Sequence, residues 1–108
     1  MWRFWWVRGY LSEGRRWLER AIAASPAAPD RTTATVLDGA GVLAEAQGDL
    51  STATRRHEAA LAMGQALKDR PAQLRSLVNL GLVADERGDF ALAMRRYEEA
   101  LAIAREVG

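Results

Sequence analysis

Apolar and small side chains recur along most of this chain at spacings of three and four residues. Such spacing places them on one side of an α-helix, and no stretch shows the strict alternation of apolar and polar residues expected of a β-strand. Turn residues divide the pattern into six predicted helices, at residues 1–8, 11–24, 31–47, 50–67, 71–87 and 90–107. The sequence therefore predicts an all-α fold.

One segment of the chain occurs three times. "GDLSTATRRHEAALA" (residues 48–62) and "GDFALAMRRYEEALA" (residues 88–102) agree at the Gly-Asp pair, the arginine pair, a glutamate and the final Ala-Leu-Ala, at an offset of 40 residues. A looser copy, "GYLSEGRRWLERAIA" (residues 9–23), lies 39 residues earlier. The segments that precede the two later copies also match each other, "LDGAGVLAEAQGD" against "LVNLGLVADERGD". Each repeat unit is therefore predicted to contain two helices.

The residues between the two helices of a unit are typical of a tight turn. Gly48 and Gly88 stand where a residue in the left-handed conformation ends a helix, and Asp49 and Asp89 follow as N-caps of the next one. The prolines of "SPAAPD" and "KDRPA" separate the units, and in the second of these Asp69 is the expected cap. The pattern thus predicts antiparallel helical hairpins.

The repeated segments resemble the tetratricopeptide repeat signature. In the third copy the matching residues are Leu77, Leu80, Gly81, Ala84, Gly88, Asp89, Phe90, Ala93, Tyr97 and Ala100. In the middle copy they are Leu37, Gly41, Gly48, Leu50, Ala53 and Ala60, and His57 stands where the family prefers an aromatic residue. The period of 39–40 residues is longer than the standard 34. It resembles the arrays of bacterial multidomain NTPase and transcriptional regulators.

This resemblance implies a right-handed superhelical stack of antiparallel helix hairpins, a tetratricopeptide-like solenoid of about two and a half repeats. We expect a partial first repeat at residues 1–29, a second at 30–69 and a third at 70–108. Family geometry places the first helices of the units on a concave partner-binding groove, with Thr35, Asp38, Val42, Glu45, Arg75, Val78, Leu82, Asp85 and Glu86. An apolar centre and an acidic rim predict a protein or peptide partner with an apolar segment flanked by basic residues.

Both ends of the repeat array are apolar. Trp2, Trp5 and Trp6 share one side of the first helix and further apolar residues occupy the other, which is typical of a helix covered on both sides. We expect either that a longer protein covers the ends or that copies of the chain associate through them. The residues expected at this self-association contact are Trp2, Trp5, Trp6, Tyr97, Leu101 and Ala104. Alternatively, the tryptophans pack locally against the second helix and Trp17.

Composition excludes several classes of function. Fifteen Lys and Arg residues against 14 Asp and Glu residues leave a net charge of +1, too small to attract nucleic acid or an anionic membrane. The chain has no cysteine, and its one histidine, His57, stands at the packing position held by Leu18 and Tyr97 in the other copies. We therefore expect no catalytic site, no metal site and no cofactor. No apolar run reaches the roughly 20 residues that span a membrane, and no signal peptide is recognisable, so a cytoplasmic location is the default.

An arginine pair recurs in each unit, at residues 15–16, 55–56 and 95–96. Aligned pairs could bind phosphate groups, but glutamates three or four residues later favour surface ion pairs instead. The sequence thus predicts a non-catalytic protein–protein interaction or self-assembly scaffold that is a segment of a larger regulatory protein. The alternative is an effector-sensing domain that binds a small molecule or nucleic acid.

Overall fold

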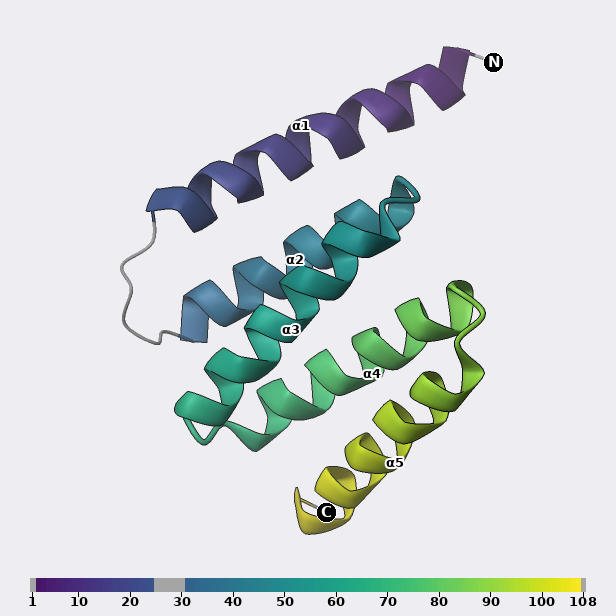
Figure 1. Ribbon diagram of the computed structural model, residues 1–108. Coiled ribbons are helices and arrows are strands. Elements are labelled where there is room, and N and C mark those ends of the chain that lie inside the picture. The colour runs from purple at the N-terminus through teal and green to yellow at the C-terminus, as the bar shows by residue number, and fades with distance from the viewer. Residues whose placement is uncertain (1, 25–30, 108) are drawn as a thin grey trace.

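A computed structural model describes residues 2–24 and 31–107, with the side chains of residues 2–10, 21, 24 and 107 outside that description. The described residues form five helices and no strand (Figure 1). The helices are α1 (Trp2–Ala24), α2 (Arg31–Ala46), α3 (Leu50–Ala66), α4 (Arg70–Glu86) and α5 (Phe90–Val107). The chain is therefore an all-α solenoid of the tetratricopeptide type, as predicted.

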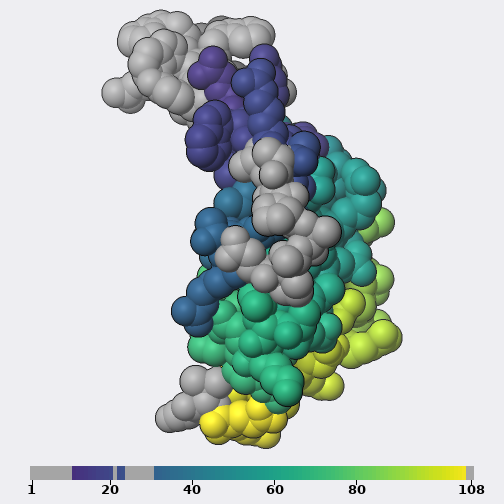
Figure 2. Space-filling model, turned by 90° about the vertical axis from the view of Figure 1, so that its left-hand side faces the viewer, coloured from purple at the N-terminus to yellow at the C-terminus, as the bar shows by residue number. Residues whose placement is uncertain are grey.

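Each helix packs on the next one along the chain, and α2 also contacts α4. Successive helices run in opposite directions, so that α2 and α4 point the same way (Figure 1). Seen from the left-hand side of that view, α1 lies at the top of the molecule and the end of α5 at the bottom (Figure 2). The resulting shape is elongated, with principal extents of 46 × 34 × 22 Å.

The N-terminal region differs from the prediction. Two helices were expected there, at residues 1–8 and 11–24, whereas α1 is one continuous helix of 23 residues. Tyr10 stands where Asp49 and Asp89 cap the helices of the later units, so no carboxylate is available to satisfy the backbone N–H groups of a new helix. An interior glycine costs a helix only about 1 kcal/mol relative to alanine, and the helix therefore continues through Gly9.

The three turns that connect α2 to α5 share one geometry. In each, a residue with positive φ follows the helix: Gly48 (80°), Lys68 (54°) and Gly88 (81°). The next backbone N–H donates to a carbonyl five residues earlier, at 2.8–2.9 Å, which is the Schellman arrangement. Asp49, Asp69 and Asp89 then each accept a backbone N–H of the following helix at 3.2 Å. The predicted glycine turns and aspartate caps are confirmed.

Small residues set the distance between the helices of a hairpin. A Cβ atom added to Gly41 would lie 2.5 Å from the His57 ring, and the Tyr97 ring lies equally tightly against Gly81. Alanines fill much of the remaining core, and the larger apolar residues gather between α3, α4 and α5. These are Leu61, Leu77, Leu80 and Ile103, with Ala100 among them. The predicted packing role of His57 is confirmed, because its side chain is fully buried.

Candidate functional site

The outer side of α2 and α4 exposes three apolar side chains. Val42 is 48% exposed, Val78 37% and Leu82 44%, whereas Leu37, Leu77 and the other core residues of the same helices are buried. Val42 and Leu82 occupy equivalent positions 40 residues apart, and α2 contacts α4 directly. We call this surface the α2–α4 face, defined by Thr35, Val42, Glu45, Arg75, Val78, Leu82, Asp85 and Glu86. The structure therefore brings all but one of the predicted groove residues together.

The acidic end of the α2–α4 face lies at the C-terminal ends of the two helices. Burial, followed by the hydrogen bond and the negative charge of Glu86, raises the pKa of Glu45 to about 7. A nearby negative charge raises the pKa of a carboxyl group because it favours the neutral form. Asp85 is exposed beside Glu86. This end of the face can therefore accept a positively charged group in exchange for a proton.

Asp38 is the predicted groove residue that lies elsewhere. It is only 4% exposed, beneath the face. Its carboxylate accepts hydrogen bonds from His57 Nδ1 of α3, Arg75 Nε of α4 and Ser76 Oγ of α4, each at 2.9 Å. Burial raises the pKa of Asp38, but the hydrogen bonds from His57, Arg75 and Ser76 outweigh it and hold the pKa below its ordinary value. Asp38 thus joins three helices and is not open to a partner.

The basic end of the face is held by this buried carboxylate. The Arg75 side chain is nearly half exposed, and its Nε atom is anchored on Asp38. Thr35 is also exposed at this end, and its hydroxyl donates to the Arg31 carbonyl oxygen at 3.1 Å. Because α2 and α4 run in the same direction, the face has a basic end, an apolar middle and an acidic end along its length (Figure 1).

Comparison with protein-family models gives a match to the tetratricopeptide repeat over residues 32–106. The chain belongs to the tetratricopeptide repeat family. Comparison with curated proteins gave no match. Tetratricopeptide repeats are a non-catalytic repeat type that generally mediates protein–protein interaction or scaffolding. The α2–α4 face, built by the first helices of the two matched repeats, is consequently the part of the chain to consider for binding.

The polar network around Asp38 is specific to one of the two tetratricopeptide repeats. Val78 and Tyr97 stand in the third repeat where Asp38 and His57 stand in the second. Both positions therefore differ between the two repeats. This joint difference is the one sequence signal that could have indicated a contact between Asp38 and His57. His57 Nε2 is buried and has no hydrogen-bond partner among the described residues.

The structure describes the side chains of only some of the residues predicted for self-association of the repeat array. The side chains of Trp2, Trp5 and Trp6 lie outside the described residues. On α5, Leu101 is exposed, together with Phe90 and Met94. Tyr97 and Ala104 are half-buried, with the Tyr97 ring against Gly81. Trp17 is 68% exposed on α1.

The described part of this tetratricopeptide array holds no group of three His, Cys, Asp or Glu side chains placed to ligate a metal ion. None of its helices combines the length and hydrophobicity that crossing a membrane requires. The two buried side-chain atoms without partners in the described residues are His57 Nε2 and Arg96 Nε.

Proposed function

We propose that this chain binds a protein partner through the α2–α4 face and acts as a non-catalytic module of a larger, cytoplasmic regulatory protein. The observation that carries the proposal is that Val42, Val78 and Leu82 are exposed on two helices in contact, between charged groups of opposite sign. Apolar surface bounded by polar groups is characteristic of binding surfaces. The long repeat period supports the regulatory setting, because it resembles repeat arrays in such proteins.

The charges of the face select the chemistry of the partner. A basic side chain is favoured beside Glu45 and Glu86, and apolar side chains are favoured over Leu82 and its two valine neighbours. An acidic side chain is favoured at the opposite end, beside Arg75. The distance along α4 from Arg75 to Glu86 is about 16 Å at 1.5 Å per residue, which about five extended residues would span. The proposed partner segment is therefore short and apolar, with at least one basic end.

A selection from a random peptide display library on the immobilised 108-residue chain tests this proposal. We expect the enriched sequences to contain an apolar centre and a basic residue, and we expect L82R to lose them. L101R is the matched control, because Leu101 is equally exposed and apolar but lies on α5. Enrichment of sequences without a basic residue, or enrichment unchanged by L82R, would contradict the proposal.

Self-assembly is a second candidate, supported by the apolar side of α5. Phe90, Met94 and Leu101 recur at spacings that place them on one side of this helix, and all three are exposed. We propose that this side contacts a second copy of the chain. Light scattering across a hundredfold dilution should show a concentration-dependent mass that L101E abolishes, and a constant monomer mass would exclude self-assembly.

A further inference from the structure

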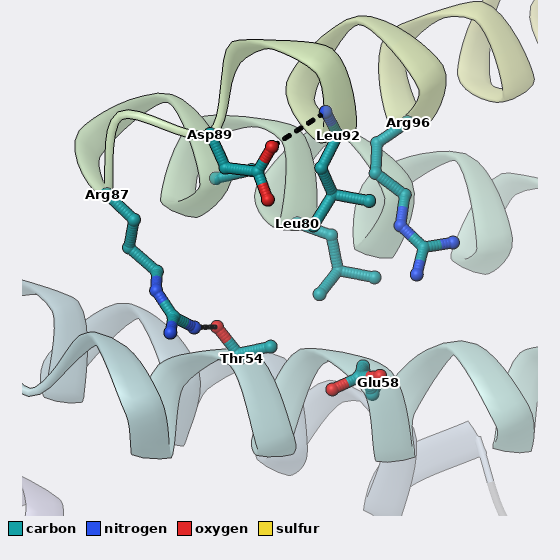
Figure 3. A pocket seen from close by; sticks show the side chains of 8 residues that line it. Thr54, Glu58, Leu80, Arg87, Asp89, Leu92 and Arg96 are labelled. Atoms are coloured by element: carbon teal, nitrogen blue, oxygen red, sulfur yellow. Dashed lines mark hydrogen bonds between the residues drawn. The ribbon is translucent and has the colours of Figure 1, made fainter.

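A cavity of about 450 Å³ lies between α3 and α5, with α4 as its floor (Figure 3). It is separate from the α2–α4 face. Its lining residues are Thr54, Glu58, Leu80, Ala84, Arg87, Asp89, Leu92 and Arg96. Its volume is within the range of small-molecule sites.

One repeat earlier, ion pairs bridge the equivalent groove between α1 and α3. There Arg15 of α1 donates to Asp49 at 2.5 Å and to Gln47 at 3.1 Å. Arg56 of α3 donates to both carboxylate oxygens of Glu19 on α1. The charges on the two sides of this groove therefore neutralise each other.

The equivalent positions around the cavity do not pair in this way. Thr54 replaces Arg15, so in the part of the chain that the structure describes Asp89 meets no arginine from α3, and its side chain caps α5 through Leu92 N. Arg96 corresponds to Arg56, yet its side chain pairs within the described residues only with Glu99 of its own helix, at 3.5 Å. Glu58, which corresponds to Glu19, makes no hydrogen bond or ion pair with the described residues. The groove therefore stays open with its charges unneutralised.

Arg87 and Arg96 stand at opposite ends of this open groove. Figure 3 shows their guanidinium groups on either side of Leu80, with Asp89 above and Glu58 below. Among the side chains that the structure describes, the Arg87 guanidinium group reaches only the Thr54 hydroxyl, at 3.4 Å. The buried Nε atom of Arg96 has no partner among the described residues. Both guanidinium groups thus have N–H groups that can donate hydrogen bonds to a ligand.

The charges of the lining residues indicate the ligand class. Two arginines and two carboxylates surround an apolar floor of Leu80, Ala84 and Leu92. A simple anion would be repelled by the two carboxylates, and a simple cation by the two guanidinium groups. A molecule with both charges and an apolar body would neutralise both sets and cover the floor. We infer that this cavity is a binding site for a small zwitterion with an apolar side chain, of the chemical class of the free α-amino acids.

This inference is tested by titrating the full chain with L-leucine and with two analogues, with binding measured by calorimetry and by NMR chemical shifts. The analogues are 3-methylbutylamine, which lacks the carboxylate, and 4-methylpentanoate, which lacks the ammonium group. We expect leucine to bind about tenfold or more tightly than either analogue, because each analogue leaves one set of charges unpaired. Absence of leucine binding at about 10 mM, or equal binding of an analogue, would overturn the inference.

Two pairs of variants assign the binding to the cavity. R96Q should weaken leucine binding about tenfold or more, whereas R95Q, which removes the same charge from an exposed neighbour, should leave it unchanged. E58Q should weaken binding in the same way, whereas E98Q, at the equivalent position of the third repeat, should not. Glu58 is exposed, so E58Q remains informative if R96Q fails to fold. If neither E58Q nor R96Q weakened leucine binding, this would contradict the assignment of the binding site to the cavity.

Discussion

The Nδ1 atom of His57 lies 2.9 Å from a carboxylate oxygen of Asp38, and both side chains are buried between α2 and α3. A carboxylate only accepts hydrogen bonds, so Nδ1 donates. The third repeat has an apolar pair, Val78 and Tyr97, at the same two positions. The hairpin of the second repeat therefore contains a buried polar contact, whereas in the third repeat the Tyr97 ring packs on Gly81 and Val78 is exposed.

Replacing Asp38 should be among the most damaging single changes in the chain. D38V leaves the His57 and Ser76 donors buried without an acceptor, and we expect the free energy of unfolding to fall by about 3 kcal/mol in urea titrations. The double variant D38V/H57Y carries the residues that the third repeat has at these two positions. It should recover at least about 1 kcal/mol of that loss, because the His57 donor is removed together with its acceptor. Additive effects of the two substitutions would show that the contact contributes no coupling.

Stability should fall as the pH rises from about 4.5 to about 7. The pKa of Glu45 is about 7 in the folded chain against an ordinary value of 4.5, so the folded state binds the proton more tightly. The resulting stabilisation is fully present below pH 4.5 and is lost as the pH rises to about 7, by about 1 kcal/mol after allowance for solvent screening. Thermal unfolding of E45Q should lack this pH dependence. D85N, at the exposed neighbour of Glu86, is the control and should retain it.

Two glycines of α2 should respond oppositely to the same substitution. In G41A the new methyl group meets the His57 ring at about 2.5 Å, and we expect a loss of about 1–3 kcal/mol. In G39A it meets only Leu18 at an ordinary 3.6 Å, so the better helix propensity of alanine should add up to about 1 kcal/mol. Chemical denaturation of both variants checks this, and equal effects would contradict the close approach at Gly41.

Lys68 is the one non-glycine residue with positive φ in the described chain. The left-handed conformation is strained for a residue with a Cβ atom, and Gly48 and Gly88 occupy the same turn position without that cost. K68G should therefore raise the free energy of unfolding by about 0.5 kcal/mol, once the greater flexibility of glycine in the unfolded chain is subtracted. G48A should lower it. Destabilisation by K68G would show that the lysine side chain contributes contacts of its own.

Local features of this chain were predictable from its sequence, and contacts between distant side chains were not. Gly48 and Asp49 determine a turn within a few residues, so the hairpins could be placed correctly. At Gly9 the same reasoning failed, because Tyr10 supplies no cap. Asp38 has the spacing of a groove residue, but its partners come from two other helices, and spacing on one helix cannot show them. The open cavity likewise depends on which arginines pair across helices.

The most direct test of partner binding at the α2–α4 face is a fluorescence anisotropy titration with a peptide enriched in the library selection. The wild-type chain and L101R should bind this peptide with the same dissociation constant. L82R should bind it at least about tenfold more weakly, because a buried apolar contact is lost and a positive charge faces the basic end of the peptide. Equal affinity of L82R and wild type would contradict the assignment of the binding surface.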